Sequence, residues 1–145
     1  IKRVISAATA QKIKQMMNAV VDDEGTGKNA AISGYSVCGK TGTAQKAGKA
    51  GKGYLKDKYT AVFTGFAPQS DPRLAILVIV DEPVKSHYGG VVAAPAFRSI
   101  MTDSLHYLSI PPDMDAKQMV ASVSEAKTSR VMKRRRTTAE GRTGE

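Results

Sequence analysis

Lys40 is the residue whose neighbours most strongly suggest chemistry, because it belongs to two different motifs. Residues 34–41 read Gly-Tyr-Ser-Val-Cys-Gly-Lys-Thr, which fits the phosphate-binding pattern G-x-x-x-x-G-K-[ST]. The apolar run Leu74–Asp81 ends in an acid of the kind that holds Mg²⁺ in a P-loop nucleotide hydrolase. A P-loop, however, opens a helix whose amides bind the phosphates, whereas Gly42 follows Thr41 at once. The nucleotide hydrolase therefore stays an alternative.

The same lysine begins the triplet Lys40-Thr41-Gly42, and Thr43 follows it. A K-T-G triplet is one signature of serine penicillin-recognising enzymes, but three common residues recur by chance. Its weight comes from spaced blocks in the same order: RVIS (3–6), GYSVCGKTGTAQK (34–46), FTGFAP (63–68), DEP (81–83) and YGGVVAAPAF (88–97). With them, residues 3–112 resemble the C-terminal part of the transpeptidase domain of class B penicillin-binding proteins, of the cell-division (septal) type.

The resemblance implies a fold and a reaction. The fold class is α/β (α+β), with the penicillin-binding-protein/β-lactamase-like transpeptidase architecture. The implied reaction is acyl transfer: a serine attacks the bond between two D-alanines of a peptidoglycan stem, and the acyl-enzyme passes to an amine of a neighbouring stem. β-Lactams trap the same acyl-enzyme. No cofactor and no metal are implied.

The resemblance also assigns roles along the K-T-G strand. Lys40 is expected to supply a fixed cation near the substrate carboxylate and the catalytic protons, and the backbone N–H of Thr43 one of two oxyanion donors. The hydroxyls of Thr41 and Thr43 can hydrogen-bond the carboxylate, and Gly42 lets a peptide approach the backbone closely. The substrate would then lie along this strand as an added β-strand. The plainer interpretation is a lysine and two threonines on a solvated strand edge.

A second group of expected substrate contacts lies after the last predicted strand. His87 and Tyr88 match an aromatic wall beside the site in this family, although relatives often carry two aromatic residues there. Tyr88 could instead pack over the end of the sheet, and His87 could be a surface residue. Cys38 adjoins the motif and is predicted to be a small buried side chain.

The chain departs from the family pattern in its nucleophile. The family order is S-x-x-K, S-x-N, K-T-G, and no S-x-N occurs here. The only S-x-x-K, at residues 124–127, follows K-T-G and lies in the polar tail, so we treat it as coincidence. The nucleophilic serine is expected upstream of Ile1, and the chain alone is expected to be inactive. A non-catalytic penicillin-binding sensor module would share the fold and the K-T-G strand.

Hydrophobic periodicity predicts the elements that position these residues. A helix is predicted at 6–22, with Ser6 as its N-cap and apolar residues at helical spacing: Ile13, Met16, Met17, Val20 and Val21. Antiparallel strands are predicted at 35–45, 59–67 and 74–81, and a second helix at 94–108. The last strand is apolar throughout, as for a strand buried on both faces, and the chain offers few elements to cover it.

Composition bounds the remaining possibilities. The chain has 145 residues, 41% hydrophobic and 24% charged, which is typical of globular domains. The net charge of +9 is concentrated in a lysine-rich loop (45–58) and a tail (126–145), so no nucleic-acid-binding face is indicated. One cysteine and two histidines leave little for a metal site. No apolar run approaches the roughly 20 residues of a membrane span.

These observations define the expected organisation. Residues 1–112 are predicted to form the C-terminal part of the transpeptidase domain, and residues 113–145 a disordered basic tail. The partners implied by the resemblance are stem peptides, β-lactams, the missing N-terminal part of the domain, and membrane proteins of the division machinery. The implied location is the periplasmic face of a bacterial inner membrane, with the anchor outside this chain.

Overall fold

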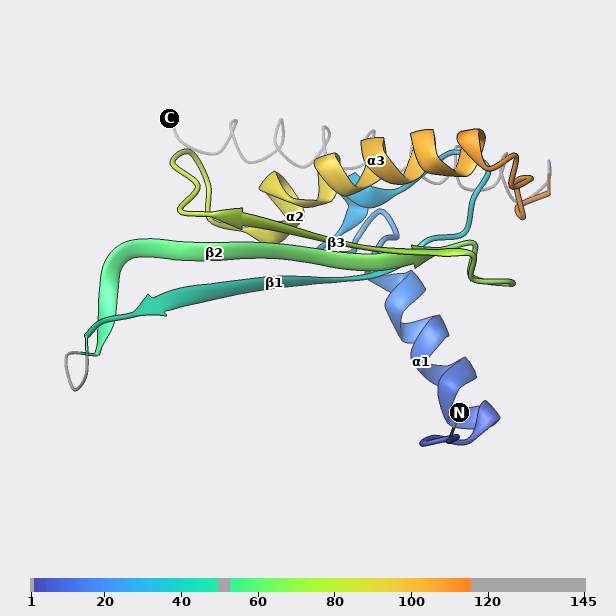
Figure 1. The fold of residues 1–145 in the computed structure, drawn as a ribbon, viewed down its shortest axis with the longest axis horizontal. Coiled ribbons are helices and arrows are strands. Elements are labelled where there is room, and N and C mark those ends of the chain that lie inside the picture. The colour runs from blue at the N-terminus through green and yellow to red at the C-terminus, as the bar shows by residue number, and fades with distance from the viewer. Residues whose placement is uncertain (1, 50–52, 116–145) are drawn as a thin grey trace, which may run out of the picture. The chain divides into compact units, whose positions relative to one another are not determined.

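The computed structural model describes residues 2–49 and 53–115. Its centre is a sheet of three antiparallel strands in the order β1-β2-β3 (Figure 1). In chain order the elements are α1 (Ala7–Ala19), a 3₁₀ turn η1 (Lys28–Ala30), β1 (Cys38–Ala47), β2 (Tyr54–Ala67), β3 (Leu74–Asp81), α2 (Gly89–Val92) and α3 (Ala94–Tyr107).

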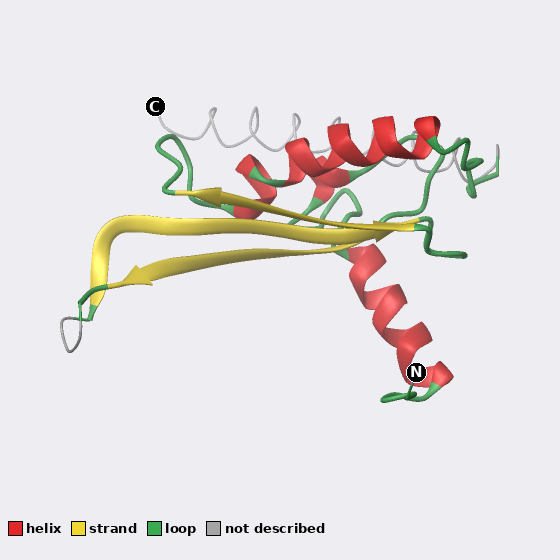
Figure 2. Cartoon of the chain, in the orientation of Figure 1, coloured by secondary structure: helices red, strands yellow, loops and turns green. Residues whose placement is uncertain are grey.

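The two faces of the sheet carry different helices, as Figures 1 and 2 show. Residues that pair across antiparallel strands point to the same face. Thr41, Phe63 and Val78 pair across the sheet, and Phe63 packs edge-to-face against Phe97 of α3, with ring centroids 4.8 Å apart. We call this side the α3 face. The opposite side is the α1 face, where the Cys38 thiol contacts α1.

The hydrophobic core lies between the α3 face and α3. One side of α3 buries Phe97, Met101 and Leu105 completely, because these residues recur at helical spacing. Side chains from β2 and the segments around η1 complete the same cluster. The core therefore fixes the middle of the sheet from one side.

The predicted elements exist, with shifted ends. Ser6 caps α1 by accepting a hydrogen bond from the Thr9 amide at 3.0 Å, as expected, and β3 has the predicted bounds. β1 begins three residues later than predicted and continues to Ala47, while β2 begins at Tyr54 instead of residue 59. The lysines and glycines of this hairpin suggested a loop, but cross-strand pairing extends as far as Ala47 and Tyr54.

One burial prediction, for β3, is wrong within the described residues. β3 alternates between half-buried and exposed side chains, so Leu77 and Ile79 on the α1 face are each 58% exposed. No residue of α1 is buried, and Met16 is 69% exposed. The apolar residues were correctly recognised, but no described segment covers them.

The strand at Lys40 excludes the P-loop alternative. Residues 34–41 run into β1, which pairs antiparallel with β2, and no helix follows Thr41. Without a helix N-terminus the amides that would bind phosphates are absent from that position. No helix within the described residues has the length and apolarity to cross a membrane.

One compact unit comprises Ile1–Asp113. Residues 113–115 of the predicted tail are described, and Asp113 makes hydrogen bonds to Ser36 within this unit. Residues 116–145, with the Ser124–Lys127 motif, lie outside the described residues.

Candidate active site

The K-T-G motif lies in β1, at one edge of the sheet. β1 pairs with β2 on one side, and no described strand pairs with its other side. Lys40 points to the α1 face, while Thr41 and Thr43 point to the α3 face, because strand residues alternate. A ligand along the free edge could thus be reached by the cation from one face and by the hydroxyls from the other.

Lys40 carries a charge that no acidic side chain of the described residues neutralises. Its side chain is exposed, and its ammonium donates a hydrogen bond to the Thr41 carbonyl at 2.8 Å. Lys46, six residues further along β1, instead lies 2.7 Å from Asp81 and 3.1 Å from Glu82. Of these two lysines on one strand, Lys40 is the one available to an anionic ligand.

The two threonine hydroxyls are oriented by neighbouring segments. The Thr41 hydroxyl lies 3.1 Å from that of Thr26, in the loop after α1. The Thr43 hydroxyl accepts a hydrogen bond from the Gly89 amide at 3.3 Å, which leaves its own proton free to donate. Hydrogen bonds therefore orient both hydroxyls, and the Thr43 hydroxyl can still donate a hydrogen bond to a carboxylate.

Two glycines near the motif have opposite packing environments. A Cβ built on Gly89, at the start of α2, would lie 2.1 Å from the Val62 carbonyl oxygen and 2.6 Å from that of Gly42. Glycine at position 89 is therefore required for α2 to lie directly on β1 and β2. A Cβ on Gly42 itself would meet only the Val62 Cβ, at an ordinary 3.5 Å. Packing does not explain the glycine at position 42.

Three aromatic rings form a stack on the same side as the threonines. His87 stacks on Tyr59 with centroids 4.3 Å apart and planes at 19°, and on Tyr88 at 4.3 Å with planes tilted by 43°. Tyr59 pairs with Gln45, two residues beyond Thr43. The sequence reasoning missed Tyr59, although strand alternation places it on the face of Thr43.

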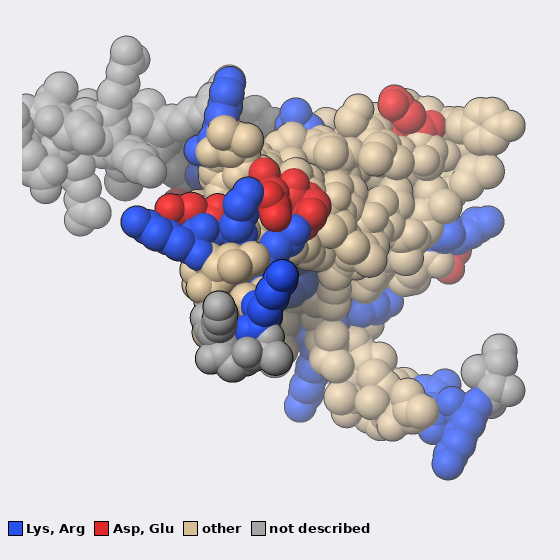
Figure 3. All heavy atoms as spheres, turned by 60° about the vertical axis from the view of Figure 1, so that its left-hand side comes forward, with Lys and Arg blue, Asp and Glu red and all other residues tan. Residues whose placement is uncertain are grey.

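A cluster of charges joins the far ends of the three strands. Lys46 of β1 contacts Asp81 and Glu82 at the end of β3, and Lys58 of β2 also contacts Glu82. Hydrogen bonds from Lys46 lower the pKa of Asp81, and those from Lys58 and Lys46 lower the pKa of Glu82. Figure 3 shows basic and acidic side chains gathered at this end of the sheet. Asp81 is thus engaged by Lys46, not held free for a metal.

Cys38 is buried, and burial disfavours its thiolate form. Desolvation by burial raises the pKa of its thiol to about 11, despite the opposing effect of Lys14. The thiol donates to the Lys14 carbonyl at 3.2 Å, in agreement with the predicted packing role. Within the described residues no three His, Cys, Asp or Glu side chains gather in a way that could hold a metal ion.

A sheet edge bearing K-T-G, backed by a C-terminal helix, defines the class of the protein as a transpeptidase-type penicillin-binding domain. Residues 1–102 match the family profile of the penicillin binding protein transpeptidase domain. The chain belongs to this family.

Sequence relatives agree with this assignment. The chain is 43% identical over 112 residues to the probable peptidoglycan D,D-transpeptidase PenA of Neisseria flavescens, covering 77% of this chain and 28% of the relative. It is 41% identical over 113 residues to the peptidoglycan D,D-transpeptidase FtsI of Escherichia coli, covering 77% and 19%. The chain thus spans less than a third of the length of these relatives.

Solved structures agree as well. The transpeptidase domain of Burkholderia pseudomallei penicillin-binding protein 3 in its apo form has a TM-score of 0.70 and 45% identity, over 79% of this chain and 34% of that one. Penicillin-binding protein 3 of Mycobacterium tuberculosis complexed with ampicillin has a TM-score of 0.69 and 37% identity, over 79% and 27%. The fold class predicted from the sequence is confirmed.

Proposed function

We propose that this chain supplies the K-T-G strand of a peptidoglycan D,D-transpeptidase that cross-links stem peptides and is acylated by β-lactams. The observation that carries the proposal is the free edge of β1, where an unneutralised Lys40 and the directed hydroxyl of Thr43 flank a glycine that packing does not require. A peptide strand ending in a carboxylate fits such an edge.

In this proposal the chemistry is shared between two parts of one domain. A serine from a segment preceding Ile1 attacks the D-Ala-D-Ala carbonyl carbon, the C–N bond breaks, and the terminal D-alanine leaves with a proton. An amine of a second stem then attacks the ester, and the serine recovers its proton. Lys40 attracts the substrate carboxylate, and the Thr43 amide stabilises the oxyanion. The chain's small coverage of its relatives supports a second part.

The remaining roles follow from position. The Thr41 and Thr43 hydroxyls hydrogen-bond the carboxylate, and Gly42 admits the peptide backbone. The stack of Tyr59, His87 and Tyr88 forms a wall for the substrate on the α3 face, with Tyr88 61% exposed. Peptidoglycan and β-lactams are the proposed ligands, and the division machinery at the periplasmic side of the inner membrane is the proposed setting. The name of the FtsI relative supports the reaction.

A hybrid domain tests the proposal. In it, this chain replaces the corresponding C-terminal third of the B. pseudomallei transpeptidase domain, whose remaining part supplies the upstream segment. We expect covalent labelling by fluorescent penicillin, reduced about ten- to a hundredfold by Lys40→Ala, because a charge-assisted contact contributes about 1.5–3 kcal/mol. Lys12→Ala, at an exposed position on α1, is the matched control.

The outcomes separate the alternatives. A folded hybrid that is not labelled would refute the proposal, and so would equal losses in the Lys40 and Lys12 variants. Turnover of a thioester substrate distinguishes a transpeptidase from a sensor module, which would be labelled but would release no product.

A further inference from the structure

Each of the four residues that lead into the K-T-G residues makes a hydrogen bond either to α1 or to the segment after α3. We call residues 35–38 the lead-in. The Tyr35 hydroxyl donates to the Ile110 carbonyl at 2.7 Å, the Ser36 amide donates to Asp113 Oδ1 at 2.7 Å, Asn18 Nδ2 donates to the Val37 carbonyl at 2.8 Å, and the Cys38 thiol donates to the Lys14 carbonyl at 3.2 Å. Two of these four contacts come from the segment after α3.

The Asp113 carboxylate accepts hydrogen bonds from two segments of the chain. Besides the Ser36 amide, its carboxylate accepts hydrogen bonds from the Ser36 hydroxyl and, at 2.9 Å, from the Ser70 hydroxyl. Its own amide donates to the Gly34 carbonyl at 3.1 Å. One half-buried side chain thus joins the lead-in, the turn between β2 and β3, and the C-terminal segment, which are distant in sequence.

The contacts continue into the neighbouring segments. The Gln69 amide donates to the Ser36 carbonyl at 2.9 Å and lies 3.0 Å from the Ser36 hydroxyl, while the Lys14 ammonium donates to the Gln69 carbonyl at 2.7 Å. Ser36 is therefore fixed by its amide, its hydroxyl and its carbonyl. Such a position leaves the chain little freedom four residues before Lys40.

The Asp113 carboxylate is suited to holding Ser36 and Ser70 because it is charged. Desolvation raises its pKa, but the hydrogen bonds from Ser36 and Ser70 outweigh that effect and lower the pKa below its ordinary value. Hydrogen bonds to an ionised acceptor are stronger than those between neutral groups. No described lysine or arginine pairs with Asp113, so its charge is directed at the backbone and hydroxyls of the junction.

We infer that Asp113 is a positioning residue for the K-T-G strand: by binding Ser36 and Ser70 it makes residues 110–113 a strap that sets where β1 begins. β1 has a strand partner on one side only among the described residues, so its free edge depends on how its ends are held. The K-T-G residues begin two positions after the lead-in. The effect on acylation rests on the proposed function; the effect on the strand does not.

The first test measures the strand without reference to activity. Hydrogen exchange by mass spectrometry is compared in the chain and in the hybrid domain for wild type, Asp113→Ala, Asp113→Asn and Ser36→Ala. We expect amides of residues 39–43 to exchange about tenfold faster in Asp113→Ala, with β2 and β3 unchanged and Asp113→Asn intermediate. Uniform acceleration of all three strands, or no change, would overturn the inference.

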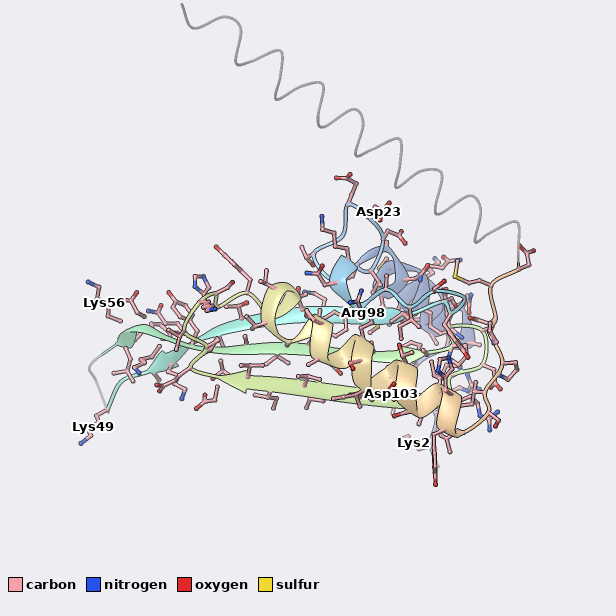
Figure 4. The ribbon with its side chains drawn as sticks, turned by 90° about the horizontal axis from the view of Figure 1, so that it is seen from above. Lys2, Asp23, Lys49, Lys56, Arg98 and Asp103 are labelled. Carbon is pink, nitrogen blue, oxygen red and sulfur yellow. The ribbon has the colours of Figure 1, made fainter. Side chains whose placement is uncertain are left out.

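Two further variants separate positioning from general stability. Ser36→Ala keeps the hydrogen bond from the residue 36 backbone amide to Asp113 and removes only the one from the hydroxyl. It is therefore the milder variant, and it replaces Asp113→Ala if that variant does not fold. Asp103→Ala is the control, since Asp103 is exposed and lies on α3 away from the β1–β2 hairpin whose tip carries Lys49 and Lys56 (Figure 4). It should leave exchange in β1 as in wild type.

The second test measures penicillin acylation of the hybrid well below its melting temperature. Asp113→Ala should slow acylation about tenfold, Asp113→Asn less, and Asp103→Ala not at all. A wild-type hybrid that is never acylated would defeat the proposed function while leaving the exchange test valid. Normal acylation in a variant whose β1 exchanges fast would show that the strap does not position the motif.

Discussion

Adding one methyl group to Gly42 and one to Gly89 should have opposite consequences, although both lie at the K-T-G strand. The Cβ of Gly42→Ala meets only the Val62 Cβ at 3.5 Å, whereas that of Gly89→Ala would lie 2.1 Å from the Val62 carbonyl oxygen. The first methyl has room in the protein. The second forces α2 away from the sheet.

The magnitudes follow from these contacts. Glycine within a strand is about 0.5–1 kcal/mol less favourable than alanine, so Gly42→Ala should leave the free energy of unfolding unchanged or raise it by up to about 1 kcal/mol. Gly89→Ala must lengthen a backbone contact from 2.1 Å to at least 3.0 Å, which rigid carbonyls resist. Overpacking of this kind costs about 1–3 kcal/mol.

The assay combines urea unfolding with fluorescent-penicillin labelling of the hybrid domain. Gly42→Ala should retain full stability yet lose at least about tenfold in acylation rate, because the methyl occupies space that a bound ligand backbone needs. Gly89→Ala should lose stability first. Wild-type labelling by Gly42→Ala would refute ligand approach at this position, and a stability loss equal to that of Gly89→Ala would refute the packing argument.

Three further predictions concern other groups. The lowered pKa of Asp113 means that its contribution to stability is complete above the ordinary value of 3.8 and is lost as pH falls through the lowered one; urea unfolding from pH 6 to 2 should show a slope that Asp113→Asn reduces. Cys38, with a pKa raised from 9.0 to about 11, should react with iodoacetamide at pH 8 at least about a hundredfold more slowly than free cysteine, and normally once urea unfolds the chain. Tyr59→Ala should remove the stacking partner of His87 and move its ring-proton NMR shifts, whereas Tyr54→Ala, at a site 71% exposed, should not.

Local sequence patterns predicted the elements well where one signal dominated. β3 has the predicted bounds because its first seven residues are continuously apolar and Pro72 and Pro83 lie just outside it. α1 begins at Ala7 because Ser6 can cap it. The motif was placed on a strand because the surrounding blocks agreed, which a pattern of three residues could not have established.

The sequence did not predict features that depend on strand pairing or on contacts between residues distant in the chain. The start of β2 at Tyr54 depends on its partner in β1, since lysine and glycine disfavour strands locally. The contact of Asp113 with Ser36 spans 77 positions, and a single aspartate after two prolines carries no local sign of it. Tyr59 and His87 likewise meet only through the fold.

β1 is held at its start, in its middle and near its end, and at none of these places through its free edge. Its start is held by Asp113 and the other lead-in partners, its middle lies beneath Gly89, and Lys46 near its end is tied to the end of β3. All three restraints act from the ends or from the α3 face, and none uses the free edge. In the proposed function β1 accepts a ligand along its free edge. It then cannot be stabilised through that edge, so its rigidity has to come from other contacts. The strap at residues 110–113 is one source of that rigidity, which is why its loss should affect the K-T-G residues before it affects the core.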